Sequence, residues 1–204
     1  MTAAQEPLWV KHYQPGVPAE IELPAESLTA MVEDAVARFG PKVALEFFGA
    51  ETTYTQLGDQ INRAAEGLRK LGVKKGHRVA IILPNCPQYL IAFYAVLRLG
   101  GVVVGHNPLY TERELRHQFE NHGAQVAIVW DKAVEKIQDF PDDVAVPSII
   151  SVDITKAMPR LKRLGLRLPI PSIRRTRAGL TTKTENTIPW EKLLANDPID
   201  PQHP

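Results

Sequence analysis

The sequence predicts an α/β protein with a mostly parallel, doubly wound sheet flanked by helices, followed by a Pro-rich basic C-terminal extension. Three observations lead to this class. Apolar runs without alternation, such as "RVAIILP" at 78–84, are typical of parallel strands covered on both faces. Amphipathic segments with a 3.6-residue repeat separate these runs, which indicates crossover helices. The periodicity is lost beyond residue 154, where seven prolines occur.

The composition is that of a soluble globular protein. The chain has 204 residues, of which 44% are hydrophobic and 23% charged, enough for one domain and a tail. The single cysteine, Cys86, excludes an internal disulfide and fits a reducing compartment. The N-terminus lacks the apolar core of a signal peptide. The longest apolar stretch, 89–104, is shorter than the roughly 20 residues of a membrane-spanning helix. We therefore expect a cytoplasmic protein.

The first half of the predicted domain follows an irregular arm at 1–26. Ser27 can cap a helix through Phe39, because a Ser side chain accepts a hydrogen bond from a free amide at the helix start. Strands at 43–48 and 52–55 predict a small antiparallel pair. The apolar repeat of 56–71 predicts the next amphipathic helix.

The second half alternates helices and strands in the same way. Asn85 is expected to cap a helix whose most buried face carries Leu90, Phe93 and Leu97. Thr111 and Glu114 form a capping box for another helix. The remaining expected elements are strands at 102–106, 125–130 and 148–153 and a weaker helix at 132–139. The α/β subdomain thus covers 27–153, and 154–204 forms an extended wrap or linker.

Charge is sorted strongly along the chain. The net charge is +1, yet no acid occurs between Asp153 and Glu185, an interval that holds nine bases. The rest of the chain therefore contains fifteen bases and all 23 acids, so it is net negative. Leucines and isoleucines alternate with these bases. This pattern favours one of two arrangements: an anionic membrane surface under the cations, or leucines packed on the protein itself. Nucleic acid is not expected, because no aromatic side chains are interleaved to stack bases.

The residues of the first arrangement form a candidate membrane or acyl-entry surface. A peripheral contact with the inner face of the membrane would place cations on lipid head groups. We name these seven residues the basic surface: Arg160, Lys162, Arg163, Arg167, Arg174, Arg175 and Arg177.

One polar corner is a candidate ligand contact. His106 and Asn107 follow a predicted parallel strand, and open α/β sheets bind ligands at the carboxyl ends of their strands. The alternative is a turn satisfied by polar side chains before Pro108.

Cys86 is interpreted as a structural residue, although a helix N-terminus could lower its pKa. His117 and His122, five residues apart, do not predict a metal pair, and a surface position is favoured for both. No catalytic, cofactor-binding or metal-ligating residue is assigned, because no nucleotide-binding or hydrolase motif occurs.

Two longer patterns resemble a known family. Thr53, Tyr54 and Leu57 read Thr-Tyr-x-x-Leu at the opening of a helix, and 97–108 joins an apolar helix end, a glycine and a strand to a polar-Pro corner. In order and spacing they resemble the first two core motifs of the AMP-forming acyl-CoA synthetases. "NPLYT" at 107–111 and "LRLPIPSIRRTRA" at 166–178 are most similar to long-chain fatty acid–CoA ligases.

The resemblance implies an activity for a longer parent protein. Such enzymes join a fatty acid to ATP as acyl-AMP and then transfer the acyl group to coenzyme A, so ATP, Mg²⁺ and coenzyme A are implied for the parent. The family's Ser/Thr/Gly-rich phosphate loop and its C-terminal catalytic lysine do not occur in these 204 residues. We therefore expect this chain alone to bind no cofactor and to be inactive.

The resemblance also implies partners and leaves alternatives. The remainder of the adenylating domain and a fatty acid are the expected partners, and a homodimer stays open. The alternatives are a fragment of an aryl-CoA ligase, a fragment of a peptide-synthetase adenylation domain, or a non-catalytic interaction or membrane-surface module.

Overall fold

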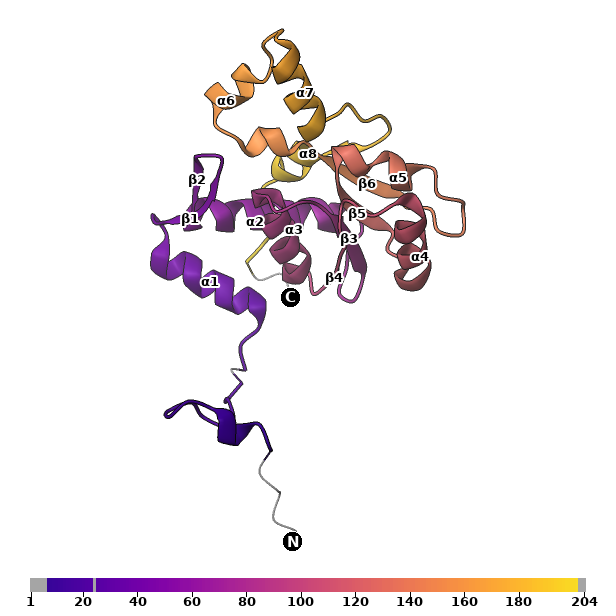
Figure 1. The fold of residues 1–204 in the computed structure, drawn as a ribbon. Coiled ribbons are helices and arrows are strands. Elements are labelled where there is room, and N and C mark those ends of the chain that lie inside the picture. Colours follow the sequence, from indigo (N-terminus) through magenta and orange to yellow (C-terminus); the bar gives the residue numbers. More distant parts are fainter. Residues whose placement is uncertain (1–6, 24, 202–204) are drawn as a thin grey trace.

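The computed structural model describes residues 7–23 and 25–201 and contains a five-stranded sheet and a two-stranded hairpin (Figure 1). The large sheet has the order β4-β3-β5-β6-β7, and every neighbouring pair in it is parallel. Its strands are β3 (Arg78–Ile82), β4 (Val102–Gly105), β5 (Val126–Trp130), β6 (Ser148–Val152) and β7 (Ile188–Pro189). The hairpin pairs β1 (Val43–Phe47) with β2 (Ala50–Thr53) in antiparallel register. The predicted α/β class with a mostly parallel sheet is confirmed.

Helices cover both faces of the sheet. Val79 and Ile81 of β3 belong to one apolar core, shared with α2, α3 and α8, whereas Ala80 and Ile82 belong to a second, shared with α4 and α5. This burial on both faces explains the lack of alternation in the strands. The helices are α1 (Leu28–Phe39), α2 (Tyr54–Lys70), α3 (Pro87–Arg98), α4 (Glu112–His122), α5 (Glu135–Gln138), α6 (Arg160–Gly165), α7 (Pro171–Leu180) and α8 (Trp190–Leu194). Within the described ranges, none of them has the length and apolar character needed to cross a membrane.

Side-chain caps fix the ends of several helices as predicted. The Ser27 hydroxyl accepts a hydrogen bond from Ala30 N at the start of α1 (3.1 Å). Thr111 and Glu114 form the reciprocal capping box of α4. Gly123 ends α4 with a φ of 59°, a left-handed conformation that costs glycine little.

The start of α3 differs from the prediction. Its N-cap is Cys86 rather than Asn85, and Pro87 occupies the first helical position. The Cys86 side chain makes no capping bond, because it is turned into the core, where only 9% of it is exposed.

The buried face of α3 was also placed wrongly. Leu90, Phe93 and Leu97 are only half-buried, and the first two pack on the margin of the first core. The helix is apolar almost all round, so the repeat alone could not select the face that meets the sheet. The side chains that α3 buries are Gln88, Ile91, Ala92, Ala95 and Val96.

The segment after residue 153 contains regular structure where the sequence predicted an extended wrap. It holds a 3₁₀ turn (Ile154–Ala157), α6, α7, β7 and α8. β7 adds to the sheet beside β6, and Trp190 and Leu193 of α8 are buried together with Ile199. β7 and α8 are short, so packing against the domain stabilises them rather than local propensity, whereas α6 and α7 bury no residue.

Both chain ends extend beyond the described residues. The predicted arm at 1–26 includes 1–6 and residue 24, and the predicted extension includes 202–204, all of which lie outside the described residues. The described part of the arm contains one 3₁₀ turn, η1 (Val10–His12), and lies apart from the sheet domain (Figure 1).

Candidate functional site

His106 lies at the carboxyl end of β4, as predicted, but it points into the second core. Its side chain is 7% exposed and stacks on Phe119 with ring centroids 5.4 Å apart. Nδ1 is bonded to Gln118, and Nε2 is buried without a hydrogen-bond partner among the described residues. Burial lowers the pKa of His106, and the bond to Gln118 opposes this effect. The imidazole is therefore held neutral by packing.

Asn107 shapes the turn that follows. Its Oδ1 accepts a hydrogen bond from Leu109 N at 2.9 Å, which closes a local turn around Pro108. This matches the alternative in which polar side chains satisfy the turn. A ligand contact at His106 and Asn107 stays a prediction.

Asp131 is a residue at the carboxyl edge that sequence reasoning missed. It follows β5 and is 2% exposed. Its Oδ2 accepts hydrogen bonds from the Thr181 hydroxyl and from Thr182 N (3.1 Å), whereas Oδ1 is buried without a partner in the described ranges. Burial raises the pKa of Asp131, and the bond from Thr181 partly offsets this. An acid directly after a buried parallel strand was the signal that could have found it.

Cys86 and the histidines of α4 carry no sign of catalysis. Burial raises the pKa of the Cys86 thiol to about 11, which favours the unreactive thiol form and outweighs nearby backbone hydrogen bonds. His117 is exposed on the surface, as predicted. His122 is not: it packs against the Phe119 ring with centroids 4.5 Å apart. Among the described residues, no group of three or more His, Cys, Asp or Glu side chains is placed to hold a metal ion.

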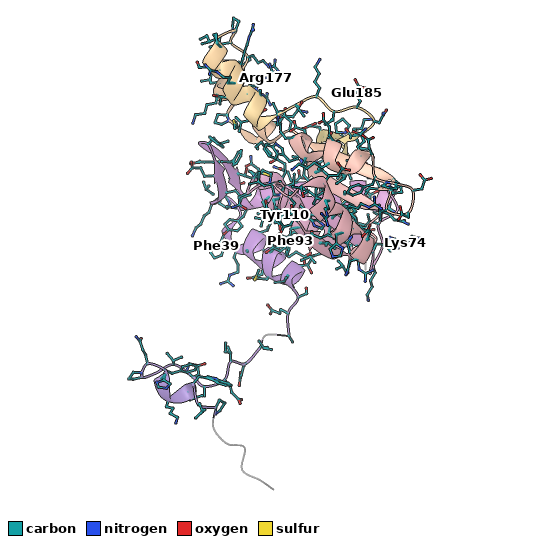
Figure 2. All side chains as sticks on the ribbon, turned by 45° about the vertical axis from the view of Figure 1, so that its right-hand side comes forward. Phe39, Lys74, Phe93, Tyr110, Arg177 and Glu185 are labelled. Atoms are coloured by element: carbon teal, nitrogen blue, oxygen red, sulfur yellow. The ribbon has the colours of Figure 1, made fainter. Side chains whose placement is uncertain are left out.

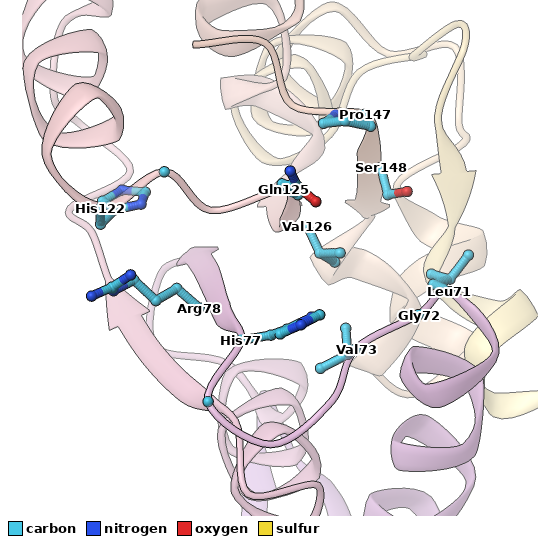
Figure 3. Close-up of a pocket in the computed structure, with 12 residues that line it drawn as sticks. Leu71, Gly72, Val73, His77, Arg78, His122, Gln125, Val126, Pro147 and Ser148 are labelled. Carbon is cyan, nitrogen blue, oxygen red and sulfur yellow. The ribbon is translucent and has the colours of Figure 1, made fainter. Parts of the chain in front are cut away.

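A pocket of about 400 Å³ opens at the amino ends of β3, β5 and β6 (Figure 3). Arg78 and His122 lie on one side of it, and Leu71, Val73 and Ser148 lie across from them. It is located at the edge of the sheet opposite His106 and Asp131. The His106 side chain nevertheless extends toward this pocket, because the ring centroids of His106 and His122 lie 5.0 Å apart.

The basic surface divides into three groups in the structure. Arg163, Arg167, Arg174 and Arg177 line a second pocket, of about 530 Å³, between α6, α7 and the carboxyl end of β6. Lys162 instead donates a hydrogen bond to the Phe48 carbonyl in the turn of the hairpin (2.8 Å). The remaining two residues, Arg160 and Arg175, line neither pocket.

The apolar side chains between these cations are mostly exposed. Leu161 is 83% exposed, and Leu164, Leu168 and Ile170 are also largely in solvent. Met158 alone among the neighbouring apolar residues is fully buried. Figure 2 shows Arg177 on the helices that project from the body of the molecule. Leu166 and Ile173 are half-buried, so the apolar side chains pack on the described part of the protein only in part, and both arrangements stay predictions.

The sequence comparison decides the family. The AMP-binding enzyme family matches residues 32–184, which include β3 to β6 of the sheet, helices α2 to α5 and both α6 and α7, and which end before β7 and α8. The chain belongs to the AMP-binding enzyme family.

Relatives within this family are acyl-CoA and aryl-CoA ligases. A long-chain-fatty-acid–CoA ligase of Bacillus subtilis strain 168 is 38% identical over 151 residues, which cover 72% of this chain and 27% of the relative. The 4-coumarate–CoA ligase 3 of Oryza sativa subsp. japonica is 39% identical over 105 residues, covering 52% of this chain and 19% of that one. This chain thus spans about a quarter of the length of the curated relatives it matches.

A solved structure supports the fold. The anthranilate CoA ligase AuaEII in complex with anthranoyl-AMP superposes with a TM-score of 0.66 at 18% identity, over 86% of this chain and 29% of that one. The parallel sheet and its flanking helices therefore have the same fold as part of that ligase.

Proposed function

We propose that this chain forms the N-terminal wall of the adenylating domain of a long-chain fatty acid–CoA ligase. The observation that carries the proposal is the 38% identity to the Bacillus ligase, which extends over most of this chain. In the parent protein, ATP and Mg²⁺ would form acyl-AMP, and coenzyme A would accept the acyl group. The charge stabilisation that phosphoryl chemistry needs would come from the remainder of the domain.

The side chains of this chain supply the scaffold in this proposal. His106 is packed in the core. Asn107 accepts a hydrogen bond within its own turn, and Asp131 accepts hydrogen bonds from the residues at the end of α7. None of them is assigned a role in proton transfer or nucleophilic attack. We therefore expect the 204-residue chain, incubated with ATP, Mg²⁺, palmitate and coenzyme A, to release no pyrophosphate above the blank.

A chimera tests the function itself. The matching N-terminal stretch of the Bacillus ligase is replaced by this chain, and acyl-CoA formation is measured with palmitate and with 4-coumarate. We expect palmitoyl-CoA formation to be retained and coumaroyl-CoA formation to stay at the blank. A folded chimera that used only coumarate would instead favour the aryl-CoA ligase alternative. A folded chimera inactive with both substrates would contradict an adenylating role.

A second function, peripheral contact with an anionic membrane, is favoured by the exposed leucines. Leu161 and Leu164 of α6 lie beside arginines that have no ion pair among the described residues, which combines apolar surface with positive charge. Each leucine inserted among lipid chains would contribute up to about 2 kcal/mol, and each nearby cation up to about 1 kcal/mol. Such a contact would allow the parent enzyme to collect fatty acid at the inner face of the membrane.

Co-sedimentation with phosphatidylglycerol vesicles tests this contact. We expect binding at low salt that weakens as salt rises, because screening shortens the range of the charges to about 10 Å at 0.1 M. Leu161→Gln with Leu164→Gln should lower binding by more than about tenfold. Leu109→Gln is the matched control, since Leu109 is also largely exposed but lies outside α6 and α7. No binding at low salt, or an equal loss in the control, would exclude the membrane contact.

A further inference from the structure

Arginines from both α6 and α7 contribute to the lining of one pocket. Arg163 and Arg167 are four residues apart around the end of α6, and Arg174 and Arg177 are three apart on α7. Residues at these spacings share one face of a helix. All four line the 530 Å³ pocket, together with Lys156 and Lys183. The two helices therefore place a set of guanidinium groups around one space.

These guanidinium groups lack carboxylate partners in the structure. Within 7–23 and 25–201, no ion pair or side-chain hydrogen bond involves Arg163, Arg167, Arg174 or Arg177. Elsewhere in the chain, arginines commonly pair, as Arg69 does with Glu66 at 2.8 Å. Like charges that lie close together without direct ion pairs raise the local positive potential. The pocket is therefore suited to an anion.

Asp153, the one acid among the described residues that line the pocket, is already hydrogen-bonded. Asp153 Oδ1 accepts bonds from Thr155 N (2.9 Å) and from the Thr155 hydroxyl (2.6 Å). Lys156, one of the two lysines, pairs with Glu191 at 2.6 Å. The four arginines and Lys183 thus remain as the free cations of this pocket within the described residues.

The pocket is held in place from both ends. The Trp130 indole donates a hydrogen bond to the Leu180 carbonyl (2.9 Å), and Asp131 binds Thr181 and Thr182 at the end of α7. Lys162 fixes α6 to the hairpin through the Phe48 carbonyl. A site whose walls are already fixed loses less conformational entropy when a ligand binds.

We propose that the pocket between α6 and α7 binds a phosphate-bearing anion. Guanidinium groups present paired N–H donors that match phosphate oxygens, and such charge-assisted bonds are the strongest hydrogen bonds in proteins. The phosphate belongs either to a soluble molecule or to a lipid head group, since the chemistry of recognition is the same. This proposal can fail without the ligase proposal failing, because the chimera measures acyl-CoA formation whereas the binding assay measures affinity for a phosphate group.

Binding of inorganic pyrophosphate and of phosphatidylglycerol vesicles to the full 204-residue chain tests the site. The pocket variant is Arg174→Gln with Arg177→Gln. The control is Arg160→Gln with Arg175→Gln, which removes the same charge from the same segment but outside the pocket lining. Thermal melts verify that every variant used in this test folds. A second pocket pair, Arg163→Gln with Arg167→Gln, removes the arginines of the opposite wall.

We expect both pocket pairs to weaken binding of a phosphate probe by at least about tenfold and the control pair to leave it within about twofold. Pocket-dependent binding of pyrophosphate would identify a soluble ligand. Pocket-dependent binding of vesicles without pyrophosphate binding would identify a lipid head group. Equal losses in pocket and control variants, an effect in one pocket pair alone, or no binding of either probe would overturn the proposal.

Discussion

His122 is a histidine that the fold keeps uncharged. Its Nδ1 accepts a hydrogen bond from Ala124 N at 3.0 Å, and its Nε2 is buried without a partner among the described residues. Burial lowers the pKa of His122 to about 4, and the nearby His106 and Arg78 add to this effect. The unfolded chain, with an ordinary histidine, takes up this proton at higher pH. Acidification through this range must therefore favour unfolding.

Replacing His122 should reduce the acid sensitivity of the protein. The free energy of unfolding of the wild type should fall as the pH drops from 7 through 6.5 toward 4. His122→Gln keeps an acceptor for Ala124 N and cannot be protonated, so its stability should fall less steeply. His106 keeps part of the dependence, because its pKa is lowered too. Urea denaturation at a series of pH values measures the slopes.

The exposed His117 provides the control for this series. His117→Gln removes a histidine from the same helix without changing the packed cluster, so the wild-type slope should be retained. Identical slopes for His122→Gln and the wild type would show that His122 is not the acid-sensitive group.

At the scale of elements, α8 packs very closely on α2 because of one glycine. A Cβ atom added to Gly67 would lie 2.8 Å from the Leu193 Cα and 2.9 Å from its Cγ. Hydrogen bonds flank this contact: Arg63 donates to the Asn196 carbonyl at 2.8 Å, and Ile199 N donates to the Asn62 carbonyl at 3.1 Å. The backbone of α8 cannot move away without losing these bonds.

The same substitution should therefore have opposite effects at two helical glycines. Gly67→Ala should destabilise the protein by about 1–3 kcal/mol, because the methyl group overpacks the contact with Leu193. Gly179→Ala has open space around it and should be neutral or stabilising by up to about 1 kcal/mol through helix propensity. Chemical denaturation of both variants gives the comparison. Equal effects would mean that the close approach of α8 does not limit stability.

The elements that the sequence predicted well carry their own local signals. The Ser27 cap and the capping box at Thr111 depend on side chains within three residues of the amides they bind, so no knowledge of the fold was needed. The face of α3 and the helices after residue 153 depend on distant partners. Ile91 is buried by the sheet and Trp190 by the first core, and neither contact is encoded in the local repeat.

The candidate site was less predictable for a similar reason. The basic surface stays a prediction, and its division into pocket and outer residues follows from the positions of α6 and α7 in the fold. Asp131 could have been suspected from its place after a strand, whereas its bonds to Thr181 and Thr182 join residues fifty positions apart. Only the folded chain brings them together.

At the scale of the whole molecule, α6 and α7 form a projecting segment between two parts of the chain that pack on the sheet domain. The chain leaves the sheet after β6 and returns to it with β7, and α8 then packs on α2 (Figure 1). Trp190, Leu193 and Ile199 of the returning segment are each at most 3% exposed. This burial should hold the returning segment in place even when the covalent connection through α6 and α7 is broken.

A protease site inserted after Leu168, between α6 and α7, tests this expectation. After cleavage, the two fragments should co-elute as one species in size-exclusion chromatography, because β7 and α8 remain docked. Trp190→Ala should cost about 3–5 kcal/mol and release the C-terminal fragment. Leu161→Ala, at an exposed position, is the control and should leave the fragments together. Dissociation of the cleaved wild type would contradict the docking.

The close fit of α8 on α2 also has a consequence for synthesis of the chain on the ribosome. The face of α2 around Gly67 is covered by residues that are translated more than a hundred positions later. At typical elongation rates of about 5–20 residues per second, this face remains without α8 for roughly 6–25 s. During that time its buried residues, Leu68 among them, lack part of their final cover. The nascent chain therefore presents an apolar surface that holding chaperones can bind until residue 199 has emerged.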